Sequence, residues 1–260
     1  MSLWESIVLG FIQGATEFLP VSSSGHLVMA QEVLSVNVAG VAFEVAVHVA
    51  TLVSILLVYR TRVRDLGVGV LTGDRESFHY LGLVAIATVP AALLGVFAKD
   101  PIEALFDNPI APGVALLVTG SFLWSSKKAL ERGSDDRPSW KAAGLIGVAQ
   151  ACALIPGISR SGATVVAAMW LGMDAREAAA FSFLMAVPAV AGAAVLQVGE
   201  MEGLMGLSGA ALLWGSVVAG ITGVLAIRTF VAILARRSFH FFAPYCWIVG
   251  AAYLVYVTVR

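Results

Sequence analysis

Ionisable side chains stand inside strongly apolar stretches of the chain at Glu17, His26, Glu44, His48 and Arg160. A charge at membrane depth costs about 2.5 to 3.5 kcal/mol on insertion scales, so such side chains tend to mark functional sites. An arginine presents a two-pronged donor to phosphate oxygens, a carboxylate binds a divalent cation or accepts a proton, and a histidine attacks or transfers protons. Together these groups suit chemistry on a phosphate ester.

Two short segments rich in Pro, Ser and Gly interrupt the apolar stretches and carry or adjoin three of these residues. Residues 19–25 read Leu-Pro-Val-Ser-Ser-Ser-Gly, and residues 155–162 read Ile-Pro-Gly-Ile-Ser-Arg-Ser-Gly. Irregular backbone at membrane depth is tolerated only where protein or a water-filled cavity satisfies its N–H and C=O groups. We therefore expect both breaks to line a site.

Candidate roles follow from the residue types. Arg160 would bind phosphate oxygens, while Glu17 would hold a divalent cation or act as a base. Ser23 and His26 are alternative nucleophiles, and His26 could instead be a general acid or base. Other hydroxyl groups of the breaks are candidate phosphate ligands: Ser22, Ser24, Ser159 and Ser161. Serines at helix starts are also common N-caps, which is the alternative for Ser22 and Ser24.

Glu44 and His48 share one face of an apolar helix because they are four residues apart. They could stand behind the site as a second layer of polar contacts or as a proton route. The alternative places Glu44 at the outer membrane interface and lets His48 bond to a neighbouring carbonyl group.

The composition favours a polytopic membrane protein over a soluble enzyme. Apolar residues make up 59% of the 260 residues and charged residues 13%, against about 45–50% and about 25% in soluble domains. The net charge of −1 leaves no basic field that would attract nucleic acid. P-loop, HExxH and GxSxG motifs are absent, and Cys152 and Cys246 lack a metal-ligand spacing.

Hydrophobic stretches of two lengths must position the candidate residues. Those long enough to cross a bilayer are residues 41–59, 79–97, 111–126, 178–196, 208–230 and 243–259. Residues 3–16 and 142–153 are too short, and each runs into a break followed by a second short stretch. The sequence thus predicts an all-α integral membrane protein with six transmembrane helices and two re-entrant helical hairpins. A stripe of small residues at Gly215, Ala219 and Gly223 indicates close helix packing.

The two halves of the chain resemble each other. Gly10, Gln13 and Gly25 recur 137 positions later as Gly147, Gln150 and Gly162. We therefore expect a single membrane domain over residues 1–260 with internal repeats at roughly 1–130 and 140–260.

The distribution of Lys and Arg orients these repeats. The connections around residues 60–75, 127–141 and 228–237 are basic, whereas residues 98–110 and 197–207 hold one Lys and no Arg. The positive-inside rule puts the basic connections in the cytoplasm, which gives the repeats opposite topology. Broken helices of inverted repeats bring their positive N-terminal ends toward one point, where an anion would bind.

The breaks read in full resemble the two signature motifs of the bacterial undecaprenyl-diphosphatases, the bacitracin-resistance family. Residues 13–26 read Gln-Gly-Ala-Thr-Glu-Phe-Leu-Pro-Val-Ser-Ser-Ser-Gly-His, and residues 156–164 read Pro-Gly-Ile-Ser-Arg-Ser-Gly-Ala-Thr. The likeness extends over the whole chain, including the segments 43–44 and 181–184.

The resemblance implies hydrolysis of undecaprenyl diphosphate to undecaprenyl phosphate and phosphate, with Mg²⁺ or Ca²⁺ as the divalent cation. That reaction recycles the lipid carrier for peptidoglycan and cell-wall synthesis, supports cell shape and gives bacitracin resistance. It also implies a multi-pass protein of the bacterial cytoplasmic (inner) membrane that acts on a long-chain polyprenyl diphosphate. We expect its cavity to face the outer, periplasmic side, and the small-residue stripe to be compatible with a homodimer.

The family's motif residues fall on identified positions of this chain. Gln13 and Glu17 match its metal-binding pair, although a neutral amide contributes no charge. The family's serine and histidine fall on Ser23 and His26, and its arginine falls on Arg160. Hydroxyl groups flank that arginine at Ser159, Ser161 and Thr164. His48 stands where some relatives carry Gln.

Two other functions fit parts of the pattern. Inverted repeats with half-helices at the midplane are transporter architecture, so the chain could flip a polyprenyl phosphate or co-transport a small anion. A flippase needs Arg160 but no nucleophile. A catalytically silent scaffold on the same fold is the third possibility, and the complete motif argues against it.

Overall fold

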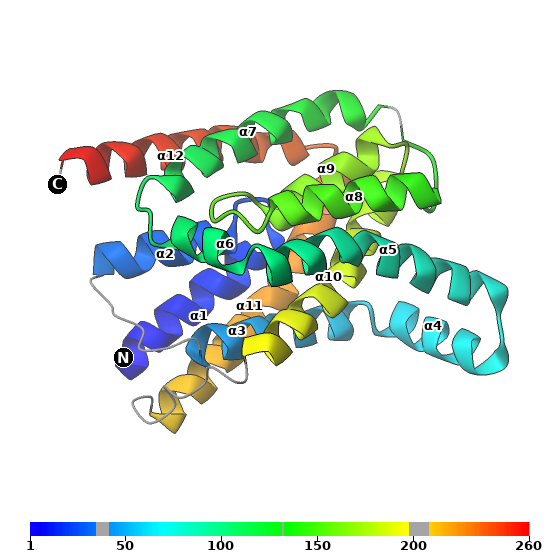
Figure 1. The fold of residues 1–260 in the computed structure, drawn as a ribbon, viewed down its shortest axis with the longest axis horizontal. Coiled ribbons are helices and arrows are strands. Elements are labelled where there is room, and N and C mark those ends of the chain that lie inside the picture. Colours follow the sequence, from blue (N-terminus) through cyan, green and yellow to red (C-terminus); the bar gives the residue numbers. More distant parts are fainter. Residues whose placement is uncertain (35–41, 132, 198–207, 260) are drawn as a thin grey trace.

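A computed structural model describes residues 1–34, 42–131, 133–197 and 208–259, and that part of the chain is helical without a β-strand (Figure 1). The elements are α1 (Leu3–Phe18), α2 (Ser23–Leu34), α3 (Ala42–Val58), α4 (Arg60–Thr72), α5 (Arg75–Phe97), α6 (Lys99–Phe106), α7 (Ala111–Ala129), α8 (Trp140–Cys152), α9 (Arg160–Trp170), α10 (Ala175–Gln197), α11 (Gly209–Ala235), the 3-10 helix η2 (Phe239–Phe241) and α12 (Phe242–Val259). The predicted all-α class is therefore confirmed.

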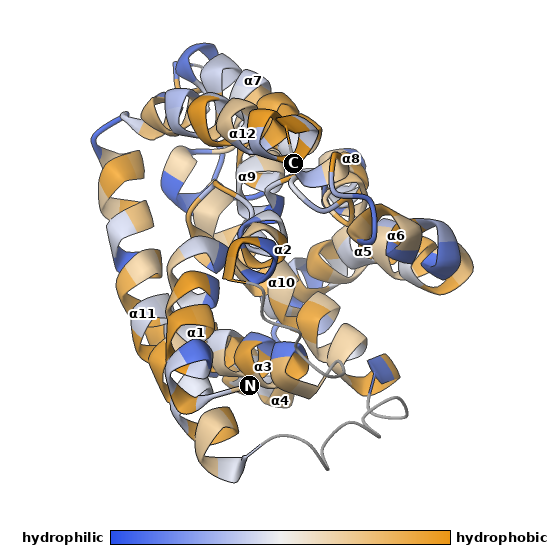
Figure 2. Ribbon diagram, turned by 90° about the vertical axis from the view of Figure 1, so that its left-hand side faces the viewer, coloured by the Kyte–Doolittle hydropathy of each residue, from blue (hydrophilic) through white to orange (hydrophobic). Residues whose placement is uncertain are grey.

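Several helices are long and apolar enough to cross a membrane. Among the described residues these are α5, α10, α11 and the continuous stretch Phe239–Val259. The count rises from 4 to 6 if the bent pairs α3–α4 and α6–α7, which turn by 78° and 98°, are each one span. Hydrophobic residues occur along most of the helices (Figure 2), and many of them are exposed, among them Phe97 at 82% and Ile248 at 69%. Exposed apolar surface of this extent fits lipid rather than water, so the protein is a multi-pass membrane protein.

Two connections that the sequence suggested to be loops contain helices. Residues 60–75 hold α4, which ends at Gly73 in the left-handed conformation with a φ of 76°. Asp74 then caps α5 by accepting hydrogen bonds from the backbone N–H groups of Glu76 and Ser77. Residues 98–110 hold the short α6. The predicted elements and charges at position 41, at Arg132 and across 198–207 lie outside the described residues.

Both breaks separate two short helices, as predicted. The first turn joins α1 to α2 and the second joins α8 to α9. The turns touch, because a Cβ added to Gly25 would lie 3.0 Å from the Cα of Gly157. The hydroxyl of Ser161 also donates to the carbonyl oxygen of Leu19 at 3.2 Å. Residues more than 130 positions apart in the sequence therefore meet at one place in the fold.

Close helix packing holds the two short first helices. In α1, a Cβ at Gly10 would overlap the carbonyl oxygen of Gly215, and one at Gly14 that of Ala219. In α8, a Cβ at Gly147 would lie 2.5 Å from the carbonyl oxygen of Ala87. The stripe predicted on α11 is thus a packing surface for α1, as the small residues indicated.

A buried aromatic cluster lies next to the turns. Phe18, the last residue of α1, meets Phe183 edge to face with ring centroids 5.5 Å apart. Phe183 in turn contacts Phe230 at 5.1 Å, and Phe230 contacts Phe239 at 5.3 Å. Such pairs contribute about 0.5 to 1.5 kcal/mol each beyond their buried area. The cluster fixes the end of α1, where Glu17 lies.

The glycine contacts yield a test of the fold. Gly10→Ala should destabilise the protein by about 1 to 3 kcal/mol, because its methyl group has no room against α11. Gly192→Ala on α10, where a Cβ meets no atom within 4 Å, is the matched control and should leave stability unchanged or raise it slightly. Thermal unfolding of the purified variants in detergent measures both, and equal midpoints would contradict the packing argument.

Candidate active site

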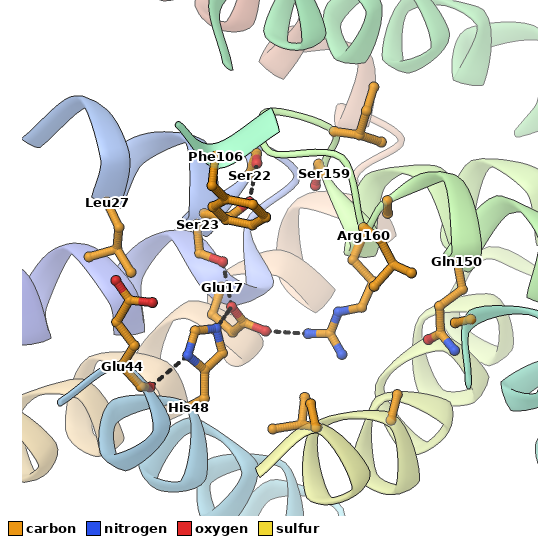
Figure 3. A pocket seen from close by; sticks show the side chains of 18 of the residues that line it. Glu17, Ser22, Ser23, Leu27, Glu44, His48, Phe106, Gln150, Ser159 and Arg160 are labelled. Atoms are coloured by element: carbon orange, nitrogen blue, oxygen red, sulfur yellow. Dashed lines mark hydrogen bonds and ion pairs between the residues drawn. The ribbon is translucent and has the colours of Figure 1, made fainter. Parts of the chain in front are cut away.

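A cavity of about 300 Å³ lies between the two turns and opens beside α3, α6 and α10 (Figure 3). Its polar lining comes from four parts of the chain: Glu17, Ser22, Ser23 and Ser24 of the first hairpin, Glu44 and His48 of α3, Gln150, Ser159 and Arg160 of the second hairpin, and Gln197 of α10. Apolar side chains from α2, α3, α5, α6, α10 and the second turn complete the lining. The structure therefore joins the two breaks in one site, as predicted.

The carboxylate of Glu17 is the centre of the polar network. Its Oε2 accepts hydrogen bonds from the hydroxyl of Ser23 at 2.5 Å and from Nε2 of Gln13 at 3.0 Å. Its Oε1 accepts a charged hydrogen bond from Nη2 of Arg160 at 2.5 Å. The carboxylate oxygens thus connect a hydroxyl group in one hairpin with the guanidinium of the other.

The first turn places the Ser23 hydroxyl against Glu17. Pro20 has no backbone N–H and cannot continue α1, whose C-cap Leu19 is already extended. Ser22 has a positive φ of 68°, which reverses the chain so that α2 begins at Ser23. The Ser22 hydroxyl accepts from the N–H of Gly25 at 3.3 Å, which agrees with its alternative role as a helix cap.

The second turn is supported from α7. The hydroxyl of Thr119 donates to the carbonyl oxygen of Gly157 at 2.8 Å and accepts from the N–H of Ser159 at 3.2 Å. Ser159 in turn caps α9 by accepting from the N–H of Gly162 at 3.1 Å. These contacts set the first residue of α9, Arg160, at the edge of the cavity.

Two of the predicted phosphate ligands point into the protein. Neither Ser161 nor Thr164 lines the cavity. Ser161 donates to the first turn, and the Thr164 hydroxyl lies 2.6 Å from that of Ser182 and donates to the carbonyl oxygen of Arg160 at 2.8 Å. Both side chains support the hairpin that carries Arg160.

His26 also lies away from the cavity lining. Its Nδ1 is 2.8 Å from the carbonyl oxygen of Ser22, and its Nε2 is 2.8 Å from the hydroxyl of Tyr245. The two rings stack with centroids 5.8 Å apart. Both ring nitrogens are therefore engaged by neighbours, and the ring links the first turn to α12.

His48 lies next to Glu17, and its ring contacts the backbone of Glu44. Nε2 of His48 is 3.9 Å from Oε2 of Glu17, while its Nδ1 is 2.7 Å from the carbonyl oxygen of Glu44. Oε1 of Glu44 accepts from Nε2 of Gln31 at 3.2 Å. Both residues line the cavity.

The donor set allows only a limited contribution to metal binding. The described residues contain no group of three or more His, Cys, Asp or Glu side chains that could hold a metal ion. Glu17 is already engaged by three donors, while Oε1 of Gln13 is buried without a hydrogen-bond partner. Mg²⁺ commonly uses one or two carboxylates together with substrate phosphates and water. Gln13 and Glu17 therefore fit a cation whose remaining ligands come from a bound phosphate and water.

Gln150 is a polar lining residue that the motif analysis did not assign to the site. It was noticed only as the repeat counterpart of Gln13, and that correspondence was the available signal. Its side chain is 3% exposed and lines the cavity beside Arg160 (Figure 3).

Fold and site together define a class of protein. It is a multi-pass helical membrane protein whose cavity holds a hydroxyl group bonded to a buried carboxylate, next to an arginine. Such a site can bind an anion and activate the hydroxyl group as a nucleophile.

Comparison with known families agrees with that class. The model of the family described as bacitracin resistance protein BacA matches residues 6–252, and the chain belongs to this family. It is 35% identical to an undecaprenyl-diphosphatase of Desulforapulum autotrophicum, with 96% of each chain covered. It is 37% identical to one of Methanobrevibacter smithii and 38% identical to undecaprenyl-diphosphatase 1 of Bacillus cereus, again with 96% of each chain covered.

The ion pair between Glu17 and Arg160 yields a stability test. Arg160→Leu leaves a buried carboxylate without its cation and should cost about 3 to 5 kcal/mol. Adding Glu17→Gln should recover part of that loss, because a neutral amide needs no counter-charge. Unfolding of the single and double variants in detergent measures the difference, and a double variant that is less stable than Arg160→Leu would contradict the pairing.

Proposed function

We propose that this protein hydrolyses undecaprenyl diphosphate to undecaprenyl phosphate and orthophosphate. The reaction returns the lipid carrier to peptidoglycan and other envelope synthesis and thereby gives bacitracin resistance. Membership of the family and the names of the full-length relatives support this activity. The structural observation that carries it is the Ser23 hydroxyl, which donates to the buried carboxylate of Glu17 beside Arg160.

In the proposed mechanism Ser23 is the nucleophile. Oε2 of Glu17 takes the hydroxyl proton while Oγ forms a bond to the terminal phosphorus, and the bond from that phosphorus to the bridging oxygen breaks. Undecaprenyl phosphate leaves with the electron pair and takes the proton from Glu17. Water then attacks the phosphoserine, Glu17 accepts its proton, and the proton returns to Oγ as orthophosphate leaves.

The remaining residues bind and orient the reactants. Nη1 of Arg160 is buried without a hydrogen-bond partner and is available to phosphate oxygens while Nη2 holds Glu17. His48, whose Nε2 is 3.9 Å from Oε2 of Glu17, would support that carboxylate. Gln13 and Glu17 would hold Mg²⁺ or Ca²⁺ brought with the diphosphate, which would neutralise phosphate charge.

The finer architecture is part of the proposal. Six spans and two re-entrant hairpins would form inverted repeats in which α1, α3 and α5 correspond to α8, α10 and α11. In support, α1 packs on α11 and α8 on α5, and likewise α3 packs on α11 and α10 on α5. If each helix is replaced by its counterpart in the other half, the α1–α11 contact becomes the α8–α5 contact, and the α3–α11 contact becomes the α10–α5 contact.

The cavity would face the periplasmic side of the inner membrane. Phe106 of α6 and Gln197, the last residue of α10, line it, and both adjoin connections that lack arginine. The positive-inside rule puts those connections outside.

The prenyl chain would leave the cavity along an apolar groove between α3, α10 and α11. Val45 and Ala194 line both the cavity and this groove, so the two are continuous. The groove is otherwise lined by apolar side chains except for Ser216. An apolar channel leading from a phosphate site matches a lipid with a diphosphate head group.

Blocking the groove should discriminate between substrates of different length. We expect Ala46→Trp to raise KM for undecaprenyl diphosphate about tenfold and to leave farnesyl diphosphate turnover largely unchanged, because a short chain needs less of the groove. Val148→Trp, at an exposed position of α8 outside the groove, is the matched control. Equal effects of Ala46→Trp on both substrates would exclude this path for the chain.

A flippase or anion transporter is the second candidate function. The observation in its favour is that the helix contacts of one half correspond to those of the other half around one cavity. This arrangement is typical of alternating-access transporters. Such a protein would bind the polyprenyl phosphate through Arg160 and would not need a nucleophile.

Phosphate release by purified protein in detergent separates the two functions, since detergent leaves no two compartments. We expect metal-stimulated release from undecaprenyl diphosphate by the unmodified protein. Ser23→Ala should lower turnover more than about 10³-fold, because the nucleophile is lost. His26→Ala and Tyr245→Phe should each cost about tenfold by loosening the first turn.

Absence of release from well-folded unmodified protein would favour the transporter. A loss in His26→Ala as large as that in Ser23→Ala would instead make His26 the nucleophile.

A further inference from the structure

We propose that the side-chain amide of Gln150 binds an oxygen of the diphosphate beside Arg160 and positions the phosphoryl group for attack. The proposal deepens the proposed function and rests on it. Gln150 is a positioning residue in this scheme, because the bond-forming groups are on the opposite wall of the cavity.

Burial without a partner is the first observation. Gln150 is only 3% exposed and lines the cavity, yet neither Nε2 nor Oε1 has a hydrogen-bond partner in the described structure. A buried polar group left unsatisfied costs about 1 to 3 kcal/mol. Nη1 of Arg160 is buried and unpartnered as well. Unpaired donors on two lining side chains indicate a ligand that accepts hydrogen bonds.

The sequence repeat explains why this amide is free. Its counterpart Gln13 donates to Glu17, the residue four positions further along α1. The residue four positions after Gln150 is Leu154, which offers no acceptor. In the first half, Gln13 therefore supports the carboxylate of Glu17. In the second half, the amide of Gln150 stays available to the cavity. Figure 3 shows the Gln150 side chain beside Arg160, on the side away from Glu17.

The chemistry of the two groups suits a diphosphate. Nε2 of Gln150 and Nη1 of Arg160 supply N–H groups, which non-bridging phosphate oxygens accept. Oε1 of Gln150 can accept from water or from a protonated phosphate oxygen. With Ser23 and Glu17 across the cavity, the phosphoryl group would be held by donors on one side and attacked from the other.

Binding measured without turnover tests the proposal first. In the Ser23→Ala background, calorimetric titration with farnesyl diphosphate should give a Kd about 10- to 100-fold higher for Gln150→Leu than for Gln150. Thermal unfolding of the same samples should show a folded variant of unchanged or higher stability, since the unsatisfied amide is removed. An unchanged Kd would overturn the proposal even if the unmodified enzyme hydrolyses its substrate.

A charge reversal in the active enzyme gives the second test. Gln150→Glu should raise KM more strongly than Gln150→Leu at neutral pH, because a carboxylate repels phosphate, and KM should recover as the pH falls and the carboxylate becomes protonated. Gln13→Leu is the matched contrast: its amide supports Glu17, so it should lower kcat more than it raises KM. A KM that is the same in Gln150→Glu and Gln150→Leu at every pH would show a structural role only.

Discussion

The ion pair between Glu17 and Arg160 is the interaction on which the site depends. It joins residues 143 positions apart and holds the two hairpins to each other across the cavity. A buried pair contributes little net stability against an apolar alternative, but either partner alone is strongly unfavourable. Each partner of the pair therefore requires the other in this buried position. The same carboxylate accepts the hydrogen bond from the hydroxyl of Ser23, the nucleophile of the proposed mechanism.

Helix packing keeps the ion pair in register. The glycines of α1 and α8 allow backbone contact with α11 and α5, so the two short helices cannot shift without overlapping carbonyl oxygens. Phe18 anchors the end of α1 in the aromatic cluster, one residue after Glu17. The hydroxyl of Ser161, a predicted phosphate ligand, ties the second turn to the first. Rigid supports of this kind keep the charged groups within hydrogen-bond distance of each other.

The sequence predicted the two turns and the charged residues of the site, because prolines and ionisable side chains are rare within apolar segments. Pro20 and Pro156 mark the two turns, and the rarity of charges in apolar segments singled out Glu17 and Arg160, which the structure brings together. The direction of single side chains was not predictable. Because Ser22 has a positive φ, the turn sends the Ser23 hydroxyl to the cavity and His26 toward Tyr245. Likewise, the helices within residues 60–75 and 98–110 were not predicted, because the charged residues in these segments were interpreted as a sign of loops.

The difference between the halves explains how a repeat can produce an asymmetric site. At corresponding positions the first half has Glu17 and Ser23, and the second has Leu154 and Arg160. One half therefore carries a carboxylate and a hydroxyl group, and the other carries a guanidinium in the matching place. Two copies of the first half would oppose two carboxylates and repel phosphate, while two copies of the second would bind phosphate without a nucleophile. Chemistry on a bound phosphate needs one of each, and the two halves supply them together in the proposed reaction.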